Sequence, residues 1–330
     1  MPSPRFTNPW PHEIHGVGDI LKWKLRLIPS EKPVLPEATN WPAPWSRITR
    51  EQMQTPPAVG WRIIWLGHAS FLVQGMGISI LIDPIFSEYC SPIPLPSLRR
   101  KVGPPCGIDD LPKIHAVLLT HSHYDHMDLA TLKVLGDRTR LIVPKGHAEW
   151  LTEKKLFRFV SELDWHEEEY VVAGVTVKAT PAQHFTARSP FDRNHGHWCG
   201  WLLEGGGCRL WHAGDSGYCP AFQEIGERYG PIDFGMIPIG AYQPRRIMKA
   251  MHMNPEEAVQ AFEDARCRRA VAMHWGTFTL TDEPVQEPAI RLRQEVERRG
   301  MGPDRFFTGR VGEIWHVTPP PAGTMDAYFK

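Results

Sequence analysis

The chain of 330 residues is 42% apolar and 22% charged, and its 37 basic residues balance its 37 acidic residues. This composition is typical of a globular protein, and the balanced charge gives no reason to expect nucleic acid as a partner. No apolar run approaches the roughly 20 residues needed to cross a bilayer. Six scattered cysteines without a C-x-x-C pair indicate reduced thiols, so we expect a cytoplasmic location.

Residues 1–58 are rich in proline and tryptophan, which predicts an extended N-terminal arm that packs on a body formed by residues 59–330. Within the arm, residues 21–27 alternate apolar and basic side chains. This alternation predicts an edge strand protected by its basic residues. The alternative is a segment that contacts an anionic lipid surface, which leaves peripheral membrane association open.

The body alternates between predicted strands and predicted helices. Strands are expected at 61–65, 71–73, 78–82, 114–119, 141–143, 171–179, 208–211, 234–239, 269–273 and 314–317, and helices at 127–135, 148–154, 255–265 and 288–299. The third of these helices has a clear start, because Asn254 is a good N-cap and Pro255 suits the first helical position. Two sets of strands with helices between them predict an α/β fold in which helices cover two packed sheets, a four-layer αββα sandwich.

A six-residue run directly after the predicted strand at 114–119 carries the strongest functional signal. Residues 121–126 read His-Ser-His-Tyr-Asp-His and place three imidazoles and one carboxylate on one short loop. Imidazole and carboxylate together suit a borderline divalent ion such as zinc. Four such groups exceed what one tetrahedral ion can take from so short a loop, so the run predicts two metal ions side by side.

Four further polar residues follow other predicted strands, namely Asp83, His184, Asp215 and His274. Taken alone, each has an ordinary explanation as a turn aspartate or as a histidine of the core or surface. However, α/β folds build their sites where strand ends converge. In the presence of the six-residue run, these four residues therefore become candidates for the same site.

The order His-x-His-x-Asp-His, followed by His184, Asp215 and His274, resembles the signature of the metallo-β-lactamase superfamily. Shorter strings resemble its N-acyl-phosphatidylethanolamine-hydrolysing phospholipase D branch, a relative of the ascorbate-6-phosphate lactonases. These strings are Leu-Gly-His-Ala-Ser at 66–70, Asp-Pro at 83–84, Gly-Asp-Ser-Gly-Tyr at 214–218, Ile-Gly-Ala-Tyr at 239–242, Asn-Pro-Glu-Glu-Ala at 254–258 and His-Trp-Gly-Thr-Phe at 274–278. The resemblance spans residues 60–317 and implies the metallo-β-lactamase-type sandwich.

The resemblance also implies seven protein ligands for two zinc ions, with Mn²⁺ or Fe²⁺ as alternatives. One ion takes His121, His123 and His184, the other takes Asp125, His126 and His274, and Asp215 bridges them. Asp83 is expected to hydrogen-bond a ligand histidine and fix its tautomer. His68 has a similar candidate role, although an ordinary turn histidine explains it equally well.

The chemistry implied is phosphodiester hydrolysis of phospholipase D type on N-acyl-phosphatidylethanolamine-like lipids. Two ions about 3.5–4 Å apart share a hydroxide that attacks phosphorus, and Asp125 or Asp215 orients it. His252 is the candidate general acid or phosphate contact, and an ordinary surface histidine is its alternative. The candidate substrate-binding residues are Arg245, Arg246 and Tyr242, with a solvated basic face as the alternative for the arginines.

Two other functions are compatible with the same residues. A lactonase or another cyclic-ester hydrolase would direct the same nucleophile at carbon instead of phosphorus. A non-catalytic binding protein with structural zinc is disfavoured, because structural sites are typically closed and rich in thiolates. The expected partner is a small-molecule or lipid substrate, with specificity set by the arm and by residues 88–112 and 186–201. The sequence leaves a homo-oligomer open.

Overall fold

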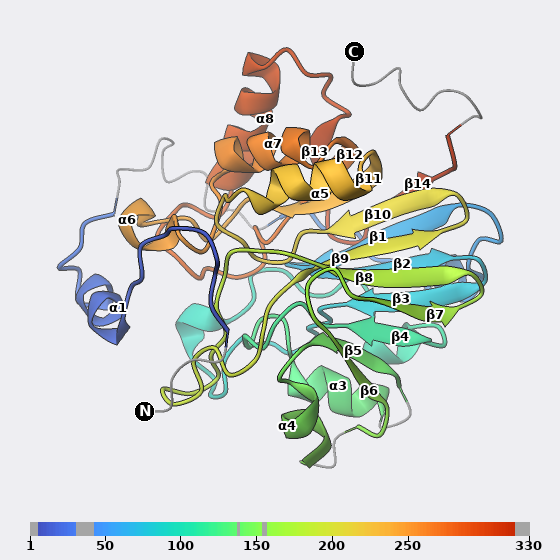
Figure 1. Ribbon diagram of the computed structural model, residues 1–330, viewed down its shortest axis with the longest axis horizontal. Helices are drawn as coiled ribbons and strands as arrows, with labels where there is room; N and C mark the ends of the chain where they lie inside the picture. The colour runs from blue at the N-terminus through green and yellow to red at the C-terminus, as the bar shows by residue number, and fades with distance from the viewer. Residues whose placement is uncertain (1–5, 31–42, 137–138, 154–156, 321–330) are drawn as a thin grey trace.

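The computed structural model describes residues 6–30, 43–136, 139–153 and 157–320 and consists of two seven-stranded sheets with helices on their outer faces (Figure 1). The first sheet has the strand order β14-β1-β2-β3-β4-β5-β6, and the second has the order β13-β12-β11-β10-β9-β8-β7. Each sheet combines antiparallel hairpins with parallel strands, as the pairing of β2 with β3 and of β3 with β4 illustrates.

The first sheet consists of β1 (Trp61–Gly67), β2 (Ser70–Gly75), β3 (Ile78–Ile82), β4 (Ala116–Leu118), β5 (Leu141–Pro144), β6 (Val160–Leu163) and β14 (Ile314–Val317). The second consists of β7 (Glu168–Val172), β8 (Val175–Thr180), β9 (Gly200–Gly205), β10 (Cys208–His212), β11 (Ile232–Pro238), β12 (Cys267–Met273) and β13 (Phe306–Thr308). The α-helices are α1 (Val17–Lys24), α2 (Arg50–Gln54), α3 (Leu129–Leu135), α4 (Ala148–Glu153), α5 (Ala221–Tyr229), α6 (Arg245–Met248), α7 (Pro255–Asp264) and α8 (Glu287–Arg298).

The side chains of the first sheet alternate between two apolar layers, as the two-residue period of a strand requires. In β1, Ile63 and Trp65 belong to the core between the sheets, whereas Ile64 and Leu66 belong to the layer on the outer face. The first sheet is therefore buried on both sides, which explains why its strands are almost uniformly apolar.

Helices complete the outer layers. Leu132 of α3 and Leu151 of α4 pack in the apolar layer outside the first sheet. The helices α5, α7 and α8 cover the second sheet, and Phe222, Phe262 and Leu292 are their buried contacts in its core. Figure 1 shows α3 and α4 on one side of the paired sheets and α5, α7 and α8 on the other. The predicted four-layer αββα sandwich is confirmed.

The predicted edge strand at residues 21–27 is wrong, because this segment belongs to helix α1 and the turn after it. The backbone N–H of Gly16 bonds the Asp19 carboxylate at the start of the helix. Trp23 packs on Ile247 and Met248, which both belong to α6. Burial of this one aromatic side chain fixes the helix, and the alternating residues around it stay exposed.

The predicted strand at 171–179 is also wrong as a single element, since it is the hairpin of β7 and β8. The chain reverses at Ala173 and Gly174, whose φ angles are 56° and 77°. The prediction also omitted β6, β9 and β13. Of these, β9 begins within residues 186–201, the segment expected to contribute to specificity, so that segment ends in the second sheet. None of the described helices has both the length and the apolar character to span a bilayer.

Candidate metal centre

The six-residue run follows β4, and a tight turn directs its side chains into one buried site. The backbone N–H groups of His126 and Met127 both donate to the carbonyl oxygen of His123, at 3.1 and 2.9 Å. This turn places the ring of His121 against the rings of His123 and His126, with centroid distances of 4.6 and 4.1 Å. The run therefore presents its imidazoles to one small volume.

Three histidines form the first group of candidate ligands. Nε2 of His121 lies 2.9 Å from Nδ1 of His123, and Nε2 of His184 lies 3.3 Å from the same atom. Oδ2 of Asp215 lies 3.9 Å from Nε2 of both His121 and His184. The first sheet supplies two of these histidines, whereas His184 and Asp215 follow β8 and β10 of the second sheet.

A second group shares that oxygen of Asp215. Nε2 of His126 lies 3.2 Å from it, and Nε2 of His274, after β12, lies 3.0 Å from it. Oδ2 of Asp125 lies 3.4 Å from both of these nitrogens. One carboxylate oxygen thus lies 3.0–3.9 Å from imidazole nitrogens of both groups.

The spacing of the donor atoms fits metal ions. Ligand atoms about 2.1 Å from a tetrahedral zinc ion lie about 3.4 Å from one another, and the donor-atom distances given above are between 2.9 and 3.9 Å. Among the described residues, Nε2 of His126, Nε2 of His274 and Oδ1 of Asp215 are buried without a hydrogen-bond partner. Buried polar atoms without partners are rare in native proteins, so these residues fit the two ions that the resemblance implies.

The electrostatics of the site agree with a cation there. Burial lowers the pKa of His123 to about 4 and that of His184 to about 3, so both are neutral and able to donate a lone pair. His274 behaves differently, because Asp215 and Asp125 outweigh the effect of burial and raise its pKa to about 9. In the metal-free chain, a proton on His274 therefore offsets part of the buried negative charge that a metal ion would otherwise balance.

Hydrogen bonds behind the ligands fix their orientation. Oδ2 of Asp83 lies 2.7 Å from Nδ1 of His126, and Asp83 also accepts hydrogen bonds from the N–H and hydroxyl of Thr120, at 2.7 and 2.6 Å. Nε2 of His68 lies 2.7 Å from Oδ2 of Asp125. Asp83 thus contacts a candidate ligand from behind, as expected for a group that sets the tautomer and ring direction of an imidazole. His68 instead contacts the Asp125 oxygen that faces the second group, so it lies beside Asp125, His126 and His274 as a further potential metal donor.

Backbone strain is present at three residues of this site. His68, Asp83 and His274 have φ angles of 53°, 43° and 60°, a region that residues other than glycine adopt uncommonly. All three lie at strand ends or in the turn between β1 and β2. Such strain concentrates at functional sites, where the surrounding structure holds it in place.

Comparison with known proteins identifies the family. The model of the beta-lactamase superfamily domain matches residues 79–275. The N-acyl-phosphatidylethanolamine-hydrolyzing phospholipase D 1 of Caenorhabditis elegans is 34% identical, over 92% of this chain and 88% of its own length. The chain belongs to the N-acyl-phosphatidylethanolamine-hydrolysing phospholipase D-like branch of the metallo-β-lactamase superfamily.

Two further relatives support this membership. The mitochondrial N-acyl-phosphatidylethanolamine-hydrolyzing phospholipase D of Saccharomyces cerevisiae is 34% identical over 76% of this chain, which covers 54% of that protein. The solved structure of Igni18, a metallo hydrolase of Ignicoccus hospitalis, has a TM-score of 0.59 at 24% identity and covers 78% of this chain and 98% of its own. The fold is thus shared with a metallo hydrolase, and the chain is a metal-dependent hydrolase of this superfamily.

The residues predicted around the metal-dependent hydrolase site occupy different environments. His252 belongs to the site, since its Nδ1 lies 3.9 Å from Oδ2 of Asp215 and its side chain is 13% exposed. Arg245 instead donates to both carboxylate oxygens of Glu257. Tyr242 is fully buried and donates its hydroxyl to Glu287 at 2.7 Å, which leaves it no surface for substrate. Arg246 is exposed at the start of α6.

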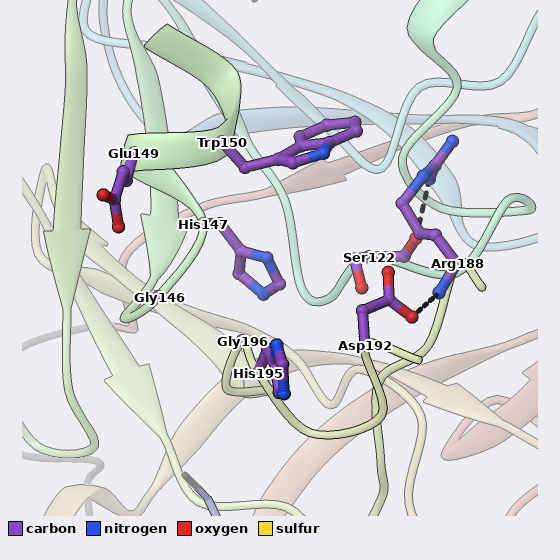
Figure 2. Close-up of a pocket in the computed structure, with 9 residues that line it drawn as sticks. All are labelled: Ser122, Gly146, His147, Glu149, Trp150, Arg188, Asp192, His195 and Gly196. Atoms are coloured by element: carbon purple, nitrogen blue, oxygen red, sulfur yellow. Dashed lines mark hydrogen bonds between the residues drawn. The ribbon is translucent and has the colours of Figure 1, made fainter. Parts of the chain in front are cut away.

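Arg188 is a residue of the site that the sequence did not reveal. One guanidinium nitrogen donates to the carbonyl oxygens of Ser122 and Met127, at 2.7 and 2.9 Å. The hydroxyl of Tyr124 donates to the carbonyl of Arg188 at 2.9 Å, and the guanidinium lies 4.0 Å from that ring. Figure 2 shows Arg188 at the edge of a cavity of about 350 Å³, bonded to Ser122. Arg188 therefore ties the segment after His184 to the loop at 121–127.

Proposed function

We propose that the chain is a phosphodiesterase of phospholipase D type that uses two zinc ions and acts on N-acyl-phosphatidylethanolamine-like lipids. The observation that carries this proposal is a cavity of about 350 Å³ that reaches the candidate ligand His184 and is lined by both apolar and polar side chains. Its apolar lining comes from the arm, from the segment after His184 and from the turn before α7, and includes Ile14, Phe185, Pro190, Phe191 and Met251. Apolar side chains beside a polar site of this kind can hold a lipid chain.

The roles of the side chains follow from their positions. Zinc ions would lower the pKa of water and offset the charge of a phosphoryl group. Asp215, which contacts both groups of candidate ligands, or Asp125, which belongs to the second group, would then orient a water molecule. Burial holds the pKa of His252 well below its usual value, so we assign this residue to phosphate contact through a neutral imidazole rather than to a permanently charged acid.

We further infer that α1 and the turn after it contact the lipid surface. Leu21, Leu25 and Leu27 are more than half exposed, and exposed basic residues alternate with them. α1 packs on α6 next to the exposed Arg246, and the arm that precedes it lines the cavity. Apolar side chains with basic neighbours are the combination that binds anionic membrane surfaces.

The decisive experiment measures hydrolysis of N-acyl-phosphatidylethanolamine in mixed micelles, with and without a chelator, in water enriched in ¹⁸O. The expected products are phosphatidic acid and N-acylethanolamine, with the ¹⁸O label in the phosphatidic acid, because attack at phosphorus adds the water oxygen there. The zinc content of the active protein should be two ions per chain.

A panel of substrates separates this proposal from the alternatives. Phosphorylated lactones and β-lactams serve as comparisons, and a lactonase would place the ¹⁸O in a new carboxylate instead. A protein that binds zinc and turns over none of these substrates would refute the phosphodiesterase proposal. The surface contact is tested with Leu21→Glu combined with Leu25→Glu, which should reduce sedimentation with anionic vesicles. Val134→Glu with Phe159→Glu, two equally exposed sites elsewhere, is the matched control.

A further inference from the structure

The N-terminal arm is docked on the segment that carries His184. The backbone N–H of Phe6 donates to the carbonyl of Asn194 at 3.3 Å, and the side-chain amide of Asn194 donates to the carbonyl of Phe6 at 3.2 Å. Trp10 stacks on Trp165 with a centroid distance of 5.6 Å. These contacts hold the arm beside the metal centre, although the two segments are far apart in the sequence.

Within this docked arm, Asn8 binds the backbone of His184 with both ends of its amide. Nδ2 of Asn8 donates to the carbonyl oxygen of His184 at 2.9 Å, and the N–H of His184 donates to Oδ1 of Asn8 at 3.2 Å. In the described part of the chain, these are the hydrogen bonds of that N–H and that carbonyl. Asn8 therefore satisfies the backbone N–H and carbonyl of His184, as a neighbouring strand would. His184 is only 1% exposed.

A third residue fixes the direction of the Asn8 amide. Nδ1 of His12 lies 2.8 Å from the carbonyl oxygen of Trp10, so it carries the proton of that ring. Nε2 of His12 can then only accept a hydrogen bond, and it lies 3.3 Å from Nδ2 of Asn8. The amide nitrogen of Asn8 thus faces both His12 and the His184 carbonyl, and its oxygen faces the His184 N–H.

The imidazole of His184 is held at one further point. Its Nδ1 lies 3.0 Å from the carbonyl oxygen of Met251, which leaves Nε2 directed at His123 and Asp215. The ring direction thus depends on two anchors, the Met251 carbonyl at the ring and the Asn8 amide at the backbone. Loss of the Asn8 anchor would leave two buried backbone groups unpaired and allow the segment to shift.

We propose that Asn8 is a positioning residue for His184 and sets the affinity of the metal ion that this histidine holds. The N-terminal arm is then a part of the metal centre as well as a wall of the cavity. The inference rests on the proposed function, in which His184 is a zinc ligand. It predicts a loss of affinity at one ion and not at both, because, among the described residues, the Asp125, His126 and His274 group makes no hydrogen bond, ion pair or ring contact with the arm.

The test measures zinc affinity by competition with a chromophoric chelator. Asn8→Ala should weaken one of the two ions by about 10–100-fold and leave the other unchanged, as is typical when a partner behind a ligand is removed. Asn8→Asp keeps the oxygen that accepts from the His184 N–H and loses both donors, so its affinity should lie between those of wild type and Asn8→Ala. The absorption spectrum of the cobalt-substituted protein should change in the same order.

Asn194→Ala is the matched control, because it removes side-chain contacts of the arm and of Thr186 without touching Asn8 or His184. Its zinc affinity should stay within about threefold of wild type, while the melting temperature of the metal-free protein falls as far as in Asn8→Ala. Wild-type affinity in Asn8→Ala would overturn the inference, and so would an equal loss in Asn194→Ala. A wild-type chain that takes up no zinc would refute the proposed function itself.

Discussion

The carboxylate of Asp83 lies 2.7 Å from Nδ1 of His126 and so fixes which nitrogen of that imidazole faces the metal centre. With the proton on Nδ1, Nε2 presents its lone pair to the ion. Both residues are fully buried, and the two hydrogen bonds from Thr120 hold the carboxylate in place. Asp83, directly after β3, thus orients the candidate ligand His126 on the loop after β4.

Substitution of Asp83 should therefore act on metal binding. Asp83→Ala is expected to weaken zinc binding by about 10–100-fold, because His126 loses the partner that selects its tautomer. Chelator competition measures this change. The control is Asp233→Ala, which removes a carboxylate that pairs with Arg268 away from the centre. Equal zinc affinity in the Asp83 variant and wild type would show that the His126 tautomer does not depend on this contact.

Removal of a ligand should abolish metal and activity together. His123→Ala is expected to lose zinc and to reduce kcat/KM by about 10³-fold or more, since metal ions contribute several kcal/mol to such reactions. Circular dichroism should show that the sheets remain folded. His316→Ala, a change at an exposed histidine of β14, serves as control. Full turnover by the His123 variant would refute the assignment of the centre.

Arg188 should contribute to both stability and metal binding. Arg188→Ala removes two charge-assisted hydrogen bonds to the ends of the 122–127 loop, and such bonds contribute about 1.5–3 kcal/mol each. Urea unfolding is expected to show a loss of about 3–6 kcal/mol, and zinc affinity should fall in parallel. Arg193→Ala, at an exposed arginine that lies over Phe185, should change neither property by a comparable amount.

His252 provides a test of the proposed phosphate contact. His252→Ala should retain both zinc ions and lower kcat by about 10²-fold or more, as is typical when one hydrogen-bond donor to the reacting oxyanion is lost, while His252→Gln, which keeps an N–H donor, should recover part of this loss. Kinetics equal to those of wild type would remove His252 from the reaction and leave the metal centre standing. A loss of zinc in the alanine variant would instead make His252 a metal ligand.

The fold class and the clustering of the candidate ligands could be predicted because their signals are local. Four of the ligands lie within six residues, and the others follow apolar strands that are easily recognised. The edge-strand prediction for residues 21–27 failed because the two-residue alternation is too short to outweigh the packing of Trp23 on α6. The β7–β8 hairpin was missed because Ala173 adopts a positive φ that alanine rarely takes.

The contacts behind the ligands could not be predicted for a different reason. Asn8 and His184 are 176 positions apart, and no periodicity links them. The role of Arg188 could not be predicted either, since its partners are backbone carbonyls that any residue could provide. The contact of Asp83 with a candidate ligand was the exception, because Asp83 follows a buried strand of the first sheet, and another strand of that sheet precedes the loop at 121–126.

The candidate ligands are divided between the two sheets, with His121 to His126 on one and His184, Asp215 and His274 on the other. Two bound ions would thus tie the halves of the sandwich together, much as a disulfide ties two strands. During synthesis, this tie could close only after residue 274 had left the ribosome. Any sliding of one sheet over the other by the length of a single residue would separate the donor atoms, so the catalytic machinery can exist only in the completed fold.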